Sequence, residues 1–130
     1  MPKGLITAMF LIACTSLSGK AAEEPELIKA HATAYCLPGK TYTGKEVREG
    51  IAASGRKEWI GKTVIIYQRL PNNRVGDMLF ILEVEDNGCS ENVVDIWQPD
   101  LVSCQRVMDR LYEDGCQGRI YCQVIEDCNG

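Results

Sequence analysis

Short apolar runs of strand length recur along most of this chain, and turn residues separate them. The runs, many of them alternating or β-branched, occupy positions 28–36, 50–53, 63–67, 78–84, 93–97 and 120–125. Breaks are supplied by Pro38-Gly39, Pro71-Asn72-Asn73 and Asn87-Gly88. Six or seven strands in one small chain predict a closed β-barrel, because closure removes exposed sheet edges.

One helix is expected near the C-terminus. Apolar residues recur at helical spacing between Leu101 and Leu111. Asp100 or Ser103 is the expected N-cap, and Gly115 is the expected stop. The predicted fold class is therefore mainly β, a six- to seven-stranded barrel with one helix near the C-terminus.

Length and charge limit the classes of function. A chain of 130 residues is expected to form a single domain with one modest core. The formal net charge of −4 argues against a nucleic-acid binder, which normally carries a basic face. We therefore expect no nucleic-acid partner.

The first residues predict export. Lys3 precedes a mainly apolar run over residues 4–13, which is too short for a bilayer span of about 20 helical residues. Cys14 ends a segment similar to a bacterial lipoprotein box, and the alternative is an ordinary signal peptide cut near Ala21 or Ala22. We expect a leader over 1–14, a tether over 15–27 and a domain over 28–130. The protein would be anchored in the bacterial cell envelope through a lipid, or secreted.

Cysteine content also favours export. Apart from Cys14 the chain has an even set of six cysteines, which predicts up to three disulfides without fixing their pairing: Cys36, Cys89, Cys104, Cys116, Cys122 and Cys128. A metal site is the weaker alternative, because no C-x-x-C pair occurs and His31 is the single histidine. We expect neither a metal nor a cofactor.

Two aspartates lie where strand-like runs end or are interrupted. Asp86 follows the run 78–84 and precedes Asn87-Gly88, so by itself it is typical of a turn. Asp95 has no turn residue beside it and is flanked by Val94 and Ile96. Desolvation there would raise the pKa of a carboxyl group and favour proton transfer near neutral pH.

An ordered set of motifs then resembles a known family. It comprises Ala32-Thr33-Ala34-Tyr35-Cys36, Thr41-Tyr42-Thr43-Gly44, Gly50-Ile51-Ala52-Ala53-Ser54, Trp59-Ile60-Gly61-Lys62, Gly76, Glu85-Asp86-Asn87-Gly88 and Val94-Asp95-Ile96-Trp97. Together these resemble the 3D (three-aspartate) domain of bacterial cell-wall lytic transglycosylases and stationary-phase survival proteins. The resemblance covers about residues 28 to 97 and implies a double-psi β-barrel.

The family's functional positions transfer one residue at a time. Asp95 matches its proposed catalytic acid, and Asp86 matches the aspartate of its D-T-G element, although Asn87 replaces the threonine. Ser54 stands where the third aspartate is usual, which raises the alternative of glycan binding without cleavage. The expected substrate-binding residues are Tyr35, Trp97, Ser54 and Thr43.

The resemblance implies cleavage of the bond between N-acetylmuramic acid and N-acetylglucosamine in peptidoglycan. Asp95 would act as acid and then as base, Asp86 would raise its pKa or hold the sugar, and Glu85 would be the fallback acid. Two alternatives are a non-catalytic, expansin-like wall-binding module and a disulfide-stapled envelope protein that binds another protein. We expect a monomer whose partners are glycan strands.

Overall fold

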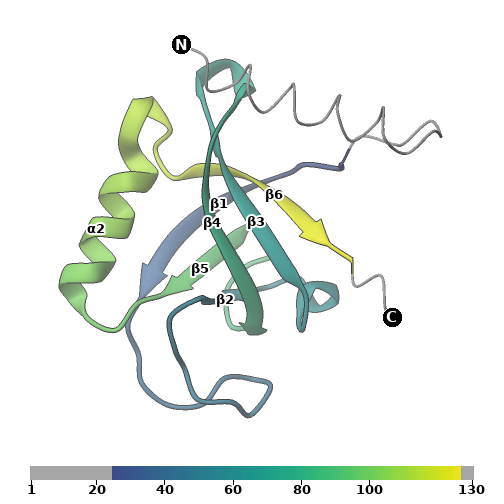
Figure 1. Cartoon of the computed structure of the whole chain (residues 1–130), viewed down its shortest axis with the longest axis vertical. Coiled ribbons are helices and arrows are strands. Elements are labelled where there is room, and N and C mark those ends of the chain that lie inside the picture. Colours follow the sequence, from purple (N-terminus) through teal and green to yellow (C-terminus); the bar gives the residue numbers. More distant parts are fainter. Residues whose placement is uncertain (1–24, 127–130) are drawn as a thin grey trace.

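The computed structural model describes residues 25–126 and forms one closed barrel. Six strands close it in the order β1-β5-β2-β4-β3-β6 (Figure 1). The elements are β1 (Ile28–Tyr35), β2 (Ile51–Ser54), η1 (Lys57–Trp59), β3 (Thr63–Arg69), η2 (Pro71–Asn73), β4 (Val75–Asp86), β5 (Val93–Trp97), α2 (Leu101–Tyr112), η3 (Glu113–Gly115) and β6 (Arg119–Ile125). The mainly β barrel with one helix near the C-terminus is confirmed.

The pairing is mixed, with two parallel pairs, β1–β5 and β2–β4, among antiparallel ones. Parallel neighbours cannot be joined by a tight hairpin, so the chain crosses the barrel between them. The β1–β2 connection is long and projects from one end of the barrel (Figure 1).

Strand alternation divides the barrel into an apolar interior and an outer face. Inward residues are fully or almost fully buried: Ala30, Ala32, Ala52, Val64, Ile66, Leu82, Val84, Val94, Ile96, Ile120 and Cys122. Small residues on β1 and β2 face larger ones on β3, β4 and β6, which lets side chains fill the interior without a channel.

The helix α2 packs against β1 along one side of the barrel (Figure 1). Its N-cap is Asp100, whose Oδ1 accepts a hydrogen bond from the backbone N–H of Ser103 at 2.7 Å. Cys104, Val107 and Leu111 form its buried stripe. The predicted helix is confirmed, and of the two residues expected as its N-cap, Asp100 holds that position.

The strand β4 is longer than the run 78–84 suggested. It begins at Val75, and Gly76 lies against the Gln68 side chain, where a Cβ would come within 2.5 Å of Oε1. Glycine allows this close approach inside the hairpin with β3. Within residues 25–126, no helix is long and apolar enough to cross a membrane.

Candidate functional site

Thr33, Asp95, Ala53 and Asp86 form a row across four neighbouring strands. Thr33 on β1 lies opposite Asp95 on β5, and Asp95 lies opposite Ala53 on β2. Ala53 in turn lies opposite Asp86 on β4, at a bulge in that pair. The two aspartates are therefore two strand spacings apart, about 9.5 Å between Cα atoms.

The row lies on the outer face of the barrel. Val94 and Ile96 on either side of Asp95 are buried in the core, so alternation turns Asp95 outward. Asp95 and Asp86 are each half-buried rather than fully exposed. The sequence predicted both aspartates, and the structure brings them onto one face.

Asp95 is a carboxyl group with few partners. Within residues 25–126 its single hydrogen-bond donor is Thr33, whose Oγ1 lies 2.8 Å from Oδ1. Burial raises the pKa of Asp95 above its ordinary value, and the Thr33 bond opposes that rise. The carboxyl groups of Asp86 and Asp95 are separated by Ala53 on the strand between them.

Asp86 accepts three hydrogen bonds from its surroundings. Its Oδ1 receives the backbone N–H groups of Tyr42 and Asn87, each at 3.0 Å. Its Oδ2 receives the Tyr35 hydroxyl at 3.3 Å. Both oxygens are occupied, and these bonds hold the β1–β2 connection and Tyr35 in position.

Tyr35 and Trp97 lie opposite each other on β1 and β5, next to the row. Burial raises the pKa of the Tyr35 phenol, and the charges of Asp86 and Asp95 raise it further. The phenol is therefore close to both carboxylates. The Trp97 indole N–H donates to the backbone oxygen of Leu37 at 2.8 Å. Both predicted aromatics flank the acids, with their polar ends already bonded to the protein.

The segment after β1 is an ordered flap beside Asp86. Lys40 and Glu46 pair as an antiparallel bridge, and the backbone N–H of Val47 donates to the Gly39 oxygen at 3.0 Å. The backbone N–H of Thr43 donates to the Glu85 oxygen at 3.3 Å. We call residues 39–48 the flap.

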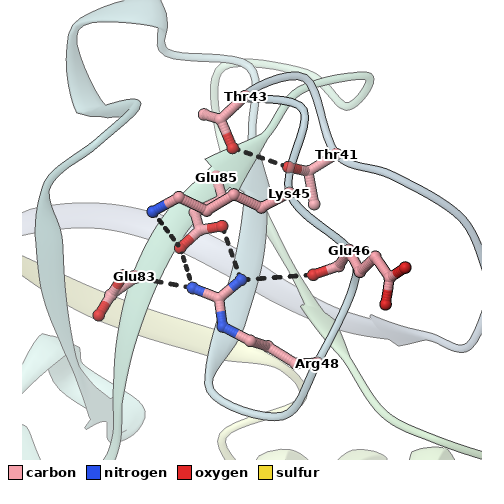
Figure 2. A network of polar contacts seen from close by, with 7 residues as sticks. All are labelled: Thr41, Thr43, Lys45, Glu46, Arg48, Glu83 and Glu85. Atoms are coloured by element: carbon pink, nitrogen blue, oxygen red, sulfur yellow. Dashed lines mark hydrogen bonds and ion pairs between the residues drawn. The ribbon is translucent and has the colours of Figure 1, made fainter.

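Glu85 and Arg48 fasten this flap to β4 (Figure 2). The Glu85 side chain is 4% exposed, and both of its oxygens accept hydrogen bonds from the Arg48 guanidinium. Lys45 adds a longer ion pair at 4.0 Å. Hydrogen bonds from Arg48 hold the pKa of Glu85 below its ordinary value, so Glu85 cannot serve as a fallback acid near neutral pH.

Thr43 and Ser54, the other predicted binding residues, differ in position. Thr43 is exposed on the flap, and its hydroxyl shares a hydrogen bond with Thr41 at 2.8 Å (Figure 2). Ser54 is fully buried and accepts a hydrogen bond from the backbone N–H of Arg56 at 3.0 Å. Its pairing with Val94 turns it into the core, so Ser54 does not reach the face that carries Asp95.

Three residues of the site were not identified from the sequence as functional. Thr33 bonds Asp95, Ala53 leaves space between the two acids, and Cys89 lies near both, since their charges raise the pKa of its thiol after burial does. Strand alternation with Tyr35 would have placed Thr33 on this face. The backbone at Cys89 passes so close to Gly55 that a Cβ at position 55 would lie 2.3 Å from the Cys89 backbone oxygen.

The predicted disulfides are absent from the described part of the chain. Cys36, Cys89, Cys104, Cys116 and Cys122 all carry free thiols. They lie in different parts of the fold, with Cys122 in the core on β6 and Cys89 in the β4–β5 loop. Cys14 and Cys128 lie outside the described residues, as do the leader and most of the tether.

The described residues 25–126 form no metal-binding cluster at the row of acids. Among residues 25–126, no group of three or more His, Cys, Asp or Glu side chains is placed to hold a metal ion. Three surface hollows of about 350 to 820 Å³ lie elsewhere, and Asp95 lines none of them. The largest surrounds Trp59 and β6. Because Val94 and Ile96 enter the core and Asp95 points away from it, any substrate of Asp95 would lie along the outer face.

No protein-family model matches this chain, and no curated protein matches it in sequence.

Proposed function

We propose that this protein is an exported, lytic transglycosylase-like enzyme that cleaves peptidoglycan and uses Asp95 as its acid/base. The observation that carries the proposal is a half-buried carboxyl group of raised pKa on the outer face of a closed barrel, in one row with a second aspartate. The motif resemblance to the 3D domain supplies the reaction class. The closed six-stranded barrel agrees with the fold that this resemblance implies.

The proposed reaction needs one carboxyl group in two roles. Protonated Asp95 gives its proton to the glycosidic oxygen as the bond to N-acetylglucosamine breaks. The resulting carboxylate takes the proton of the muramic acid 6-hydroxyl, whose oxygen attacks its own anomeric carbon. The product is a 1,6-anhydro sugar, and no water is consumed. Thr33 occupies Oδ1, which leaves Oδ2 to carry the proton.

The remaining residues would position the glycan. Trp97 offers a ring whose indole N–H is held by Leu37, so it is available for stacking on a sugar. Asp86 fixes the positions of Tyr35 and of the flap. The exposed Thr43 on the flap would then contact the glycan strand. On this proposal Asp86 and Tyr35 are positioning residues, and Asp95 is the catalytic residue.

The test is digestion of purified sacculi followed by mass spectrometry of the soluble products. Wild type should release 1,6-anhydromuropeptides, and Asp95→Asn should lose this product. The matched control is Asp109→Asn, which alters an exposed aspartate on α2. Reducing-end muropeptides would show hydrolysis instead of transglycosylation. Intact sacculi after treatment with folded wild type across pH 4–8 would overturn the proposal.

A specific observation favours the second candidate, a non-catalytic, expansin-like wall-binding module. The third aspartate of the family pattern is replaced by Ser54, and Ser54 is buried away from the row. A binding module should co-sediment with peptidoglycan equally well as wild type and as Asp95→Asn. Binding lost on Trp97→Ala but kept in Asp95→Asn, without any anhydro product, would select this module over the enzyme.

Export, lipid anchoring and a monomeric state belong to the same proposal. Cys14 would carry the lipid if the leader is of the lipoprotein class. Labelling with a radioactive fatty acid in wild type and Cys14→Ser separates the lipoprotein from a cleaved secretory form. Sedimentation velocity of the processed protein tests the monomer.

A further inference from the structure

Three basic residues lie in one row across the strands β3, β6 and β1, which are neighbours in the barrel (Figure 1). His31 on β1 pairs with Arg119 on β6. Gln68 on β3 pairs with Ile120 on β6 in antiparallel register, so the next residue of β3, Arg69, lies beside Arg119. We call Arg69, Arg119 and His31 the basic row.

The basic row lies on the same outer face as Asp95. Ala30 and Ala32 on either side of His31 are buried, so His31 points outward. Thr33, two residues further along β1, also points outward and bonds Asp95. Residues two apart on a strand are separated by about 6–7 Å, so the basic row borders the candidate acid.

Arg69 is a buried cation whose hydrogen bonds all go to uncharged oxygens. It is 9% exposed. Its Nε donates to the backbone oxygen of Ile120 at 3.2 Å, and its terminal nitrogens donate to the backbone oxygen of Ala30 at 3.1 Å and to Oδ1 of Asn73 at 3.3 Å. The guanidinium also lies 5.8 Å from the centre of the Tyr121 ring. Burying a charge without an opposite charge is costly, so an anion bound beside Arg69 would offset that cost.

The other basic side chains of this face have no carboxylate partner either. Arg119 donates to the backbone oxygen of Gly115 at 3.0 Å. In the described part of the chain, no side-chain hydrogen bond or ion pair joins His31 to another residue, and the same holds for the exposed Lys29, two residues before it on this face. Like charges on neighbouring strands destabilise a sheet, so this face also gains stability from a bound anion.

We propose that the basic row, together with Lys29, binds a carboxylate of the substrate on which Asp95 acts. The inference rests on the proposed peptidoglycan function and names the substrate class, which is glycan carrying a stem peptide with free carboxylates rather than bare glycan. Guanidinium and ammonium groups bind carboxylates through charge-assisted hydrogen bonds. The stem peptide begins on the muramic acid whose glycosidic bond is cleaved, so a bound substrate brings its carboxylates to the neighbourhood of Asp95.

The experiment measures binding by titration calorimetry, with the soluble disaccharide N-acetylglucosaminyl-N-acetylmuramyl tetrapeptide as the probe. The probe has no bond from muramic acid to a following N-acetylglucosamine, so wild type binds it without the proposed cleavage. A matched probe carries primary amides in place of the peptide carboxylates. Wild type should bind the acidic probe at least about tenfold more tightly than the amide probe. Added salt should reduce this preference, because charge attraction contributes to it.

Variants test whether the basic row causes the preference. Arg119→Gln should lose most of it, and Lys29→Gln, at an exposed position where the fold is not disturbed, should lose part of it. The matched control is Arg106→Gln, which alters an exposed arginine of α2 outside the basic row and should keep the full preference. Thermal melts of each variant establish that it is folded.

Two results would overturn the proposal. One is equal affinity of wild type for the acidic and the amide probes, including no binding of either. The other is a preference that survives unchanged in both Arg119→Gln and Lys29→Gln. Neither result decides the enzyme proposal, which depends on the anhydro product from sacculi. A preference lost in Arg119→Gln, with sacculi left intact by wild type, would keep the carboxylate site as part of a wall-binding module and remove the transglycosylase.

Discussion

Breaking the Arg48–Glu85 pair gives the sharpest test of how the flap is held. The Glu85 carboxylate is almost completely buried, and Arg48 bonds both of its oxygens. Arg48→Met would leave a buried carboxylate with Lys45 at 4.0 Å as its remaining cation. We therefore expect the variant to lose stability and to release the flap from β4.

The size of the loss follows from the burial of the two partners. Removing one partner of a fully buried ion pair costs about 3–5 kcal/mol. Here the Arg48 side chain is 44% exposed, so water already screens its end of the pair. We expect Arg48→Met to lower the free energy of unfolding by about 2–3 kcal/mol, equivalent to about 10–20 °C in Tm.

Two further variants control for other effects of the change. Lys45→Met removes an exposed cation at 4.0 Å from Glu85 and should alter stability by less than about 0.5 kcal/mol. The double variant Arg48→Met/Glu85→Leu removes both charges and should recover most of the loss, because no buried charge then lacks a partner. Urea unfolding monitored by tryptophan fluorescence provides the free energies.

The pH dependence of the same variants gives a second check. Because Arg48 holds the pKa of Glu85 below its ordinary value, the pair stabilises the fold fully above that ordinary value. The stabilisation is lost as the pH falls through the lowered pKa. The difference between wild type and Arg48→Met should therefore shrink in acid. An Arg48→Met loss no larger than that of Lys45→Met, or one that grows in acid, would refute the reasoning.

Three other changes probe the row of acids. Asp95→Asn should stabilise the fold near neutral pH. The pKa of Asp95 is raised in the folded protein, so wild type loses stability as the pH rises through that pKa. Thermal melts of both proteins from pH 4 to 8 measure the difference. Thr33→Val should raise that pKa further, and so move the alkaline limb of any Asp95-dependent sacculus cleavage to higher pH. Gly55→Ala should cost about 1–3 kcal/mol and displace the loop at Cys89 and Ser90, because its Cβ would lie within 2.4 Å of their backbone atoms; Ser90→Ala is the control.

Local sequence patterns predict the strands, the helix and the outward direction of Asp95. Alternation around Asp95 is a local property, since Val94 and Ile96 must enter the core and the residue between them must point away from it. The same local logic placed the helix, whose apolar spacing and Asp100 cap are contiguous in the chain. These features needed no knowledge of which strands pair.

Which residues share the site depends on how the strands pair. The parallel pairing of β1 with β5 sets Thr33 beside Asp95, and the pairing of β2 with both β5 and β4 sets Ala53 between the acids. Ser54 and Glu85 are two further residues whose burial could not be predicted from the local sequence. Their burial depends on a neighbouring strand or on Arg48, and partners brought together by strand order leave no mark on the local sequence.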